Sequence, residues 1–107
     1  MKIDKTQHFD KDGFSGDFYV SNEDKKGFNA LRVSVHGKHP RKKMIDTTRV
    51  YFVIDGEGTF TLNETKHNAK KNDLFVVEPD NEYEYEGTMN LFEFNVSPNN
   101  SFKAELL

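Results

Sequence analysis

The stretch Arg49-Val50-Tyr51-Phe52-Val53-Ile54-Asp55-Gly56-Glu57-Gly58 decides the fold class of this chain. Its residues from Val50 to Ile54 are all β-branched or aromatic, which is typical of a strand that is covered on both faces. The glycines that follow take positive φ at little steric cost and therefore favour a turn. Because Thr59–Leu62 then alternates polar and apolar residues, the sequence predicts a β-hairpin over 49–62.

Short segments of similar character occur on both sides of this hairpin. Phe28–His36 alternates cleanly, with Leu31, Val33 and Val35 on one face, which predicts a half-buried strand. No segment shows helical periodicity, so the fold class predicted is all-β, a sandwich or a barrel. Further strands are expected at 14–20, 74–77, 83–86 and 91–96, loops at 37–47 and 63–72, and arms or edge strands at 1–13 and 104–107.

Length and composition describe one small domain. The chain has 107 residues, enough for a single domain over 1–107, and it has no cysteine, which excludes disulfides and thiolate metal sites. Its net charge of -3 has both signs mixed along the chain, so neither nucleic acid nor an anionic membrane is expected as a partner. A polar N-terminus and the lack of a long apolar run predict a cytoplasmic protein. Ten Phe and four Tyr predict an aromatic-rich core.

Two motifs resemble those of the small single-domain cupins, which are jelly-roll β-barrels. The family's first motif is Gly, five residues, His-x-His, three or four residues, Glu, six residues, Gly, and Gly37 and Gly56 fit its two ends. The second motif is Gly, five residues, Pro-x-Gly-x-x-His, three residues, Asn, which the segment 72–83 fits with Pro79 displaced by one. The resemblance implies a single jelly-roll barrel, with a core at about 28–96 and an arm at each end.

The positions that ligate a divalent metal in that family are substituted in this sequence. The two histidine positions of the first motif hold Lys43 and Ile45, its glutamate position holds Arg49, and the histidine position of the second motif holds Tyr83. Isoleucine has no donor atom, and the cationic side chains repel a metal ion, so only a lone phenol is left. The sequence therefore predicts a barrel without the family's metal and without another cofactor.

The same substitutions predict a positively charged cavity. In the register that the motifs imply, Lys43 and Arg49 point inward beside the tyrosines. Cations inside a barrel need an anionic partner, which could be a ligand carboxylate or phosphate or a glutamate of the chain itself. The first function that we expect is binding of a small polar or anionic molecule, such as a sugar derivative. The expected ligand-binding residues are Lys43, Arg49, Tyr51, Tyr83 and Tyr85.

Proton transfer without a metal is the alternative function. Some cupins are sugar isomerases or epimerases in which histidine and tyrosine shuttle protons, and the candidates here are His36 as the base and Tyr51 or Tyr83 as the acid. Arg49 beside a phenol would lower the pKa of that phenol toward neutrality. A third possibility is a closed barrel that acts as a structural or regulatory module through its interface.

Two further patterns involve histidine and lysine. His36 and His39 could share a metal ion only with a third ligand such as Asp46 or His67, and two solvent-exposed histidines are the plainer interpretation. The basic run 38–43 lacks interleaved aromatic residues, so we interpret it as a solvated loop. Small cupins usually pair through edge strands, and the resemblance therefore implies a homodimer.

Overall fold

The computed structural model describes all residues, 1–107, and consists almost entirely of antiparallel strands. The strands form one hydrogen-bonded sheet in the order β1-β2-β3-β7-β4-β5, with β6 beside β4 and β8 beside β3. The prediction of an all-β fold is confirmed. The elements are β1 (Gln7–Lys11), β2 (Phe14–Val20), the 3₁₀ turn η1 (Asn22–Asp24), β3 (Phe28–Met44), β4 (Thr48–Leu62), β5 (Thr65–Lys70), β6 (Leu74–Val77), β7 (Glu82–Val96) and β8 (Ala104–Leu106).

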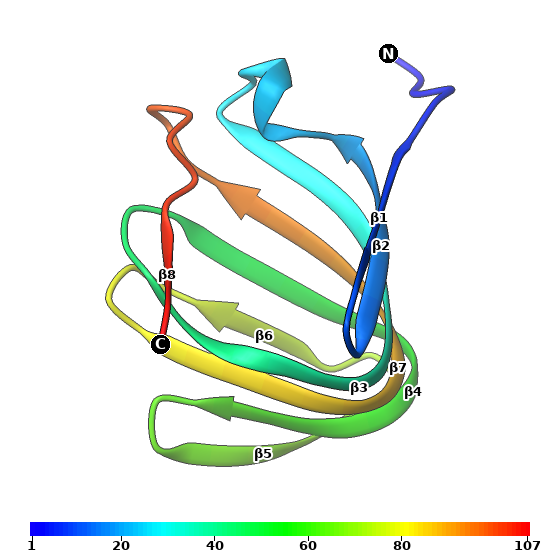
Figure 1. Cartoon of the computed structure of the whole chain (residues 1–107), viewed down its shortest axis with the longest axis vertical. Coiled ribbons are helices and arrows are strands. Elements are labelled where there is room, and N and C mark those ends of the chain that lie inside the picture. Colours follow the sequence, from blue (N-terminus) through cyan, green and yellow to red (C-terminus); the bar gives the residue numbers. More distant parts are fainter.

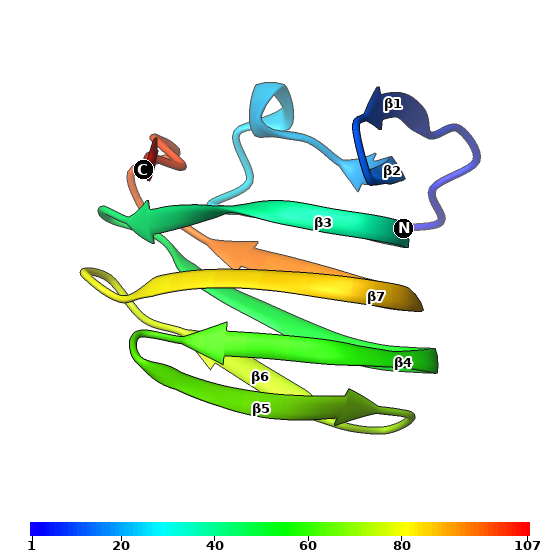
Figure 2. The same cartoon turned by 60° about the horizontal axis from the view of Figure 1, so that its bottom comes forward.

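Three long strands fold this sheet over on itself. β3, β4 and β7 each curve through the bend at the right of Figure 1 and so contribute to an upper and a lower layer. Figure 2 shows β3, β7, β4 and β5 side by side in the lower layer. Glycines line the bend, where Gly37 and Gly58 both pair with Gly87. Gly87 has a φ of +144°, and a Cβ there would lie 2.5 Å from the Cα of Gly58, so only glycine fits.

The hairpin predicted over 49–62 is wrong, because β4 runs through Asp55–Gly58 without turning back. Its first half pairs with β6 and its second half with β5, while β7 accompanies both halves. The register shifts between Val53 and Asp55, where one extra residue forms a bulge, and Gly56 has a φ of +85°. The turn chemistry in this stretch therefore bends one strand instead of connecting two.

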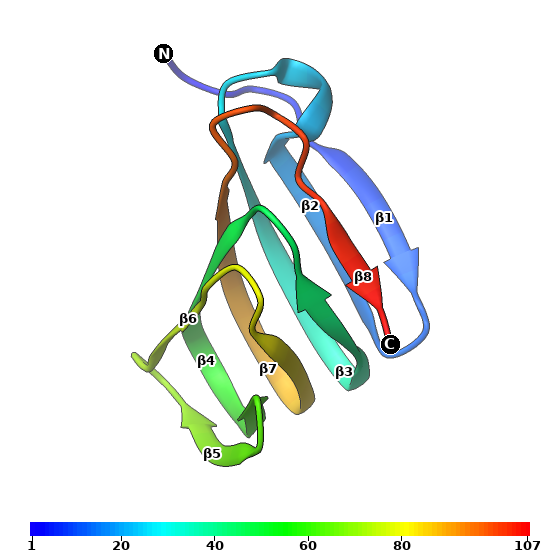
Figure 3. The same ribbon diagram turned by 90° about the vertical axis from the view of Figure 1, so that its left-hand side faces the viewer.

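Two segments that were expected to be loops contain strands. β3 continues through most of 37–47, and β5 lies within 63–72. Both segments were predicted as loops because they are rich in polar residues. These residues are polar because one face of the end of β3 and nearly all of β5 are exposed to solvent. Both chain ends pair as edge strands, and Figure 3 shows the β1–β2 hairpin and β8 on the same side of β3. The strands predicted at 14–20 and 74–77 are confirmed, whereas the two predicted at 83–86 and 91–96 are parts of one continuous strand, β7.

The core lies between the two layers and is rich in aromatic rings, as predicted. Phe60 of the lower layer stacks on Phe75 of the upper layer with 4.5 Å between the ring centroids. Phe9 and Phe14 of the β1–β2 hairpin pack against the same core. Burying a side chain of this size stabilises the fold by about 2 kcal/mol, so these contacts hold the layers together. The structure has no helix that is long and apolar enough to cross a membrane.

Candidate functional site

Charged and hydroxyl-bearing side chains from β4 and β7 meet between the layers. Arg49 donates a hydrogen bond from Nε to Oδ1 of Asn95 at 2.6 Å and one from a terminal nitrogen to the hydroxyl of Tyr83 at 2.5 Å. The same Nε lies 3.4 Å from Oε2 of Glu93. The hydroxyl oxygens of Tyr83 and Tyr51 are 3.1 Å apart. We call Arg49, Tyr51, Tyr83, Glu93 and Asn95 the inner polar cluster.

Arg49 points inward, as expected, but its guanidinium already has partners. The side chain is 14% exposed and forms an ion pair with Glu93, whose side chain is 9% exposed. Burial lowers the pKa of Arg49, but the carboxylate of Glu93 and the tyrosine hydroxyls outweigh burial and raise the pKa well above its usual value. Of the two anionic partners that the sequence left open, the structure contains the internal glutamate.

The three candidate tyrosines all lie inside the layers. Tyr51, Tyr83 and Tyr85 are at most 2% exposed. Burial raises the pKa of each phenol, and the charge of Glu93 raises it further. The expectation that Arg49 brings a phenol pKa toward neutrality is therefore wrong, since burial and Glu93 outweigh the guanidinium. At physiological pH these tyrosines are neutral hydrogen-bond donors.

The hydroxyl of Tyr85 is buried and has no hydrogen-bond partner of good geometry within the chain, although, against the larger effect of burial, the neighbouring hydroxyl of Tyr51 is among the groups that lower the pKa of Tyr85. A buried hydroxyl in that state costs about 1–3 kcal/mol. The ring is packed edge-on against Tyr51, with 5.4 Å between centroids, so the hydroxyl belongs to the same interior as the inner polar cluster. Unsatisfied buried groups in native structures call for a cause, and a ligand atom that bonds to this hydroxyl would supply one.

His39 is the histidine that lies inside the layers. It is 3% exposed, and its ring stacks on Tyr85 with 4.6 Å between centroids. Its Nδ1 donates to the carbonyl oxygen of Pro40 at 2.7 Å, because a carbonyl can only accept, and Nε2 is therefore left as an acceptor. Burial, together with the charges of Lys42 and Arg49, lowers the pKa of His39 to about 3. The imidazole is neutral at physiological pH.

His36 lies outside the barrel and cannot act as a base within it. His36 is exposed, and His39 is three residues further along the same strand. Because side chains alternate between the faces of a strand, an odd separation places these two side chains on opposite faces. That geometry also excludes the two histidines as a metal-binding pair. The signal that could have found His39 is the alternation over Leu31–Val35, which continues through Gly37 once β3 is extended.

Lys43 also lies outside the inner polar cluster, and Lys42 is the lysine of this segment that stands on the inner face. His39 pairs with Tyr85 and Lys42 pairs with Tyr83, so β3 advances by three residues while β7 advances by two. This bulge shifts the register by one residue. Lys42 therefore shares the inner face with the fully buried Met44, whereas Lys43 alternates to the outer face. Ile45 of the motif is 39% exposed for the same reason.

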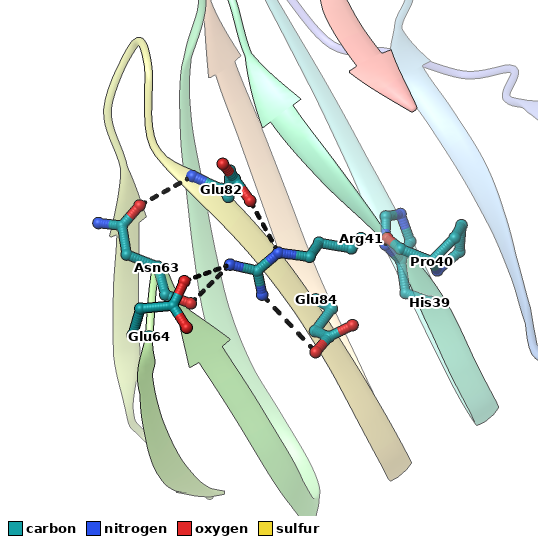
Figure 4. Close-up of polar contacts among 7 residues, drawn as sticks. All are labelled: His39, Pro40, Arg41, Asn63, Glu64, Glu82 and Glu84. Atoms are coloured by element: carbon teal, nitrogen blue, oxygen red, sulfur yellow. Dashed lines mark hydrogen bonds and ion pairs between the residues drawn. The ribbon is translucent and has the colours of Figure 1, made fainter. Parts of the chain in front are cut away.

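Arg41 holds the bulge in place from the outer face. Its Nε donates to Glu82 at 2.9 Å, and a terminal nitrogen donates to the carbonyl oxygen of Asn63 at 2.7 Å, as Figure 4 shows. Oxygens of Glu64 and Glu84 lie 3.6 and 3.7 Å from nitrogens of the same guanidinium. These contacts tie the end of β3 to the start of β7 and to the β4–β5 turn.

The side chains between the layers do not fit the metal of the cupin motifs. No three His, Cys, Asp or Glu residues are grouped so that they could hold an ion. The inner face offers one imidazole and one carboxylate, and the carboxylate of Glu93 is paired with Arg49. The ammonium of Lys42 adds a second positive charge nearby, which repels a metal ion. The inner face therefore lacks the set of donors with which the cupin motifs hold a metal ion.

Comparison with protein families identifies the domain. The family described as AraC-like ligand binding domain matches residues 27–107. This chain belongs to the AraC-like ligand binding domain family. No curated protein sequence matches the AraC-like domain.

Solved structures with the same fold as this AraC-like domain are cupins. The Streptomyces protein Pac13, described as a nucleoside dehydratase, is 24% identical with a TM-score of 0.83 over 99% of this chain and 88% of Pac13. KdgF from Halomonas sp. is 13% identical with a TM-score of 0.72 over 87% and 86% of the two chains. Salicylate 1,2-dioxygenase from Pseudoaminobacter salicylatoxidans is 20% identical with a TM-score of 0.74 over 88% and 29%. The predicted small cupin with a jelly-roll barrel is confirmed.

Three further solved structures are of Pac13 variants with uridine, each 23% identical to this chain with a TM-score of 0.83. The variants replace one histidine and two tyrosines, which are 13 and 34 residues apart in chain order. In the AraC-like domain, His39, Tyr51 and Tyr85 follow one another at 12 and 34 residues. The two chains therefore carry a histidine and two tyrosines in the same order at nearly the same spacing.

We expect the stability of the AraC-like domain to depend on pH through His39. Its folded-state pKa of about 3 lies below 6.5, the value for an unburied histidine, so between these values the unfolded chain binds the extra proton. The stability due to this neutral imidazole is fully present above the unfolded pKa and is lost as the pH falls toward 3. The loss amounts to at most about 1.4 kcal/mol per pH unit.

Urea unfolding of the wild type and of His39→Gln, from pH 7 down to pH 4, measures this dependence. The wild type should lose more stability than the variant on acidification, so the difference between them should shrink. The pKa of His8 is raised by hydrogen bonds to Asp17 and Asp10, but His8 is present in both proteins. Its contribution therefore cancels in the difference between the two stabilities. Parallel stability curves for the two proteins would show that His39 is not held neutral.

Proposed function

We propose that this domain binds a small polyhydroxylated molecule of the nucleoside type and transfers protons on it without a metal. One observation carries the proposal: the buried hydroxyl of Tyr85 has no hydrogen-bond partner of good geometry within the chain, and the ring of His39 is stacked against that tyrosine. Because Nδ1 of His39 donates to Pro40, its Nε2 is the acceptor of the ring, and it receives no hydrogen bond from the chain. A ligand hydroxyl that accepts from one and donates to the other would remove the cost of the orphan group.

The charge distribution of the inner polar cluster suits a neutral polar ligand. The guanidinium of Arg49 is paired with Glu93, and the surrounding phenols are neutral. Arg49 also donates to Tyr83, whose hydroxyl shares a hydrogen bond with Tyr51. Such a chain is polarised toward its cationic end, so it can stabilise negative charge on a ligand oxygen. His39 is the acceptor for the proton whose removal creates that charge.

Elimination of water is the reaction class to test first. Pac13, which shares this fold, is described as a nucleoside dehydratase and was solved with uridine. In such a step His39 would take a proton from carbon while a double bond forms, and Tyr51 or Tyr85 would protonate the departing hydroxide, which leaves as water. The isomerase alternative keeps the same proton transfer, with His39 in place of His36.

Uridine is the probe for this proposal, titrated calorimetrically into the wild type, Tyr85→Phe and His39→Gln. Tyr85→Phe removes the orphan hydroxyl, so it should be as stable as the wild type or more stable by about 1 kcal/mol. It should nevertheless bind uridine at least about 10-fold more weakly, which corresponds to about 1.4 kcal/mol. Tyr19→Phe is the matched control, because Tyr19 lies on β2 outside the core cluster and should leave the affinity unchanged.

Turnover is followed by mass spectrometry of uridine and its ring-modified analogues, with loss of water expected for the wild type and not for His39→Gln. A Tyr85→Phe variant that binds uridine as tightly as the wild type would contradict the proposed site. A wild-type protein that binds no nucleoside at all would contradict the ligand class.

We further propose that two copies of the chain pair through the outer face of the upper layer. Apolar side chains lie in register there across β3, β7, β4 and β6, and Leu74 and Val76 are 59% and 40% exposed. Charged residues make up 31% of the chain, but Arg32 is the only one among these rows, and it lies at their end. A second copy can therefore pack against this face without burying like charges. The rows consist of Phe28, Ala30, Val50, Phe52, Leu74, Val76, Phe92, Phe94 and Val96.

The predicted pairing through edge strands is less favourable than pairing through this apolar face. β1 and β5 are short and carry mostly exposed polar side chains, which blunt an edge against strand addition. Large exposed apolar patches mark interaction sites, and two twisted sheets pack face to face at about 30°. A dimer of this kind is also what the regulatory interpretation of the chain would require. The cytoplasmic location stays a prediction.

A further inference from the structure

The free edge of β3 forms the floor of a cleft outside the inner polar cluster. β2 pairs with β3 only as far as Val35, and β8 joins the same edge at Lys42, so the segment between them has no neighbouring strand on that side. A cleft of about 660 Å³ lies along this free edge, between the β1–β2 turn and Leu106 of β8. Its floor includes most of the basic run 38–43, which the sequence alone suggested was a solvated loop.

Positive charge dominates the cleft. Lys11, Lys38 and Lys42 all line it, and none of them forms an ion pair with a carboxylate of the chain. Apart from Glu84, Asp12 in the β1–β2 turn is the carboxylate that lines the cleft, and it too has no ion pair.

The other two charged residues of the cleft neutralise each other. Arg41 lies 3.7 Å from Glu84 and also donates to Glu82, as Figure 4 shows. Its guanidinium is therefore not available to a ligand. With this pair set aside, three lysines and one aspartate leave an excess of two positive charges along the cleft.

Lys42 connects the cleft with the interior of the barrel. Its side chain is half-buried, and the charges that face it are those of Arg49, Glu93 and Lys11. Burial lowers the pKa of Lys42, and the positive charge of Arg49 lowers it further. A half-buried ammonium without a carboxylate at hydrogen-bond distance is costly, and an anion in the cleft would be its missing partner.

The cleft also shares an apolar wall with the candidate site. Phe14 lines the cleft, and its ring packs on His39 with 4.7 Å between centroids. The turn that precedes Phe14 is held against β3 by a hydrogen bond from the backbone nitrogen of His36 to the carbonyl oxygen of Gly13. A molecule anchored in the cleft by an anionic group therefore lies one side chain away from His39.

We propose that this cleft binds the phosphate of a small phosphate monoester, with Lys42, Lys11 and Lys38 as the residues that hold it. A phosphate monoester carries a charge of about -1.5 to -2 at neutral pH, which matches two excess positive charges better than one carboxylate does. The inference rests on the proposed function in one respect, which is that the organic part of the same molecule is the nucleoside-type ligand of the inner site.

Uridine 5′-monophosphate, uridine, inorganic phosphate and acetate are the probes, each titrated into the full chain at low and high salt. The monophosphate should bind at least about 10-fold more tightly than uridine, with an advantage that falls as salt screens the lysines. Inorganic phosphate alone should bind weakly, and more tightly than acetate. Lys42→Met keeps the aliphatic stem and should remove most of the advantage, and Lys11→Gln, an exposed change, should reduce it. Lys26→Gln is the control away from the cleft.

The outcomes separate this inference from the proposed function. Equal affinity for uridine and its monophosphate would overturn the phosphate site, and so would an advantage that survives in both Lys42→Met and Lys11→Gln. Phosphate binding that depends on Lys42, in a protein that binds no uridine, would leave the phosphate site standing and remove the nucleoside function. A protein that binds uridine but binds no phosphate would keep the nucleoside function and overturn the phosphate site.

Discussion

Replacing Arg49 with methionine should destabilise the domain by about 3–5 kcal/mol, because the change leaves a buried carboxylate without its cation. Glu93 is 9% exposed, and the guanidinium of Arg49 is its ion-pair partner at 3.4 Å. The same substitution removes the donor to Asn95 and the donor to the hydroxyl of Tyr83. The loss is measured as the free energy of unfolding in urea, with the folded state checked by near-UV circular dichroism.

A double-mutant cycle separates the ion pair from the packing of Arg49. Glu93→Gln alone leaves the guanidinium buried without its anion, and the double variant Arg49→Met/Glu93→Gln removes both charges. The double variant should be more stable than the sum of the two single losses predicts, by an interaction energy of about 1–3 kcal/mol. Lys66→Met, at an exposed position of β5 outside the apolar rows, is the control and should change stability by less than about 0.5 kcal/mol. A small loss for Arg49→Met would mean that water reaches the pair.

Replacing Phe94 with lysine should weaken self-association by at least about 100-fold, or about 2.7 kcal/mol. Phe94 lies in the middle of the apolar rows, between Ala30 of β3 and Val50 of β4, and its ring stacks on Phe28 with 5.4 Å between centroids. A charge at that place would be buried without a partner in a symmetric dimer. Sedimentation equilibrium over a range of protein concentrations measures the association.

A second variant guards against misfolding at that position. Val76→Lys changes a 40% exposed residue of the same rows, so it should weaken the dimer while the monomer stays folded. Ile45→Lys, at a similarly exposed apolar residue outside the rows, should leave the dimer intact. A wild-type protein that sediments as a monomer at every concentration would rule out the proposed pairing, and so would a dimer that tolerates both lysines.

The segment that resembles the second cupin motif has a left-handed backbone at the motif's two glycine positions, although neither residue is glycine. Asn72 and Asp80 stand at the two glycine positions of that motif, and their φ values are +75° and +72°. Asparagine and aspartate tolerate this left-handed conformation better than other side chains with a Cβ, because their short polar groups bond locally. The side chain of Asp73 also bonds the backbone nitrogen of Lys70 at 2.9 Å, which closes the turn before β6. Backbone conformation is therefore preserved in this motif although the residue types differ.

Three site residues that were not predicted to line the site, Glu93, Asn95 and His39, follow from strand alternation. Alternation in β7 puts Leu91 in the core, and the next residues on that face are Glu93 and Asn95. The same reasoning along β3 leads to His39. Polar residues and Gly37 interrupt the apolar pattern, and polar side chains usually face solvent, so alternation alone does not predict that these residues are buried.

The sequence by itself determined that the chain is a small all-β cupin, that Tyr51, Tyr83 and Tyr85 line its interior, and that the metal-binding positions of the motifs lack suitable donors. Only the tertiary structure decided that Lys42 rather than Lys43 faces inward and that Glu93 is the partner of Arg49. The physical reason is that strand alternation is a local property, whereas a bulge depends on the register between strands far apart in the sequence. One extra residue between His39 and Lys42 turns every following side chain to the other face.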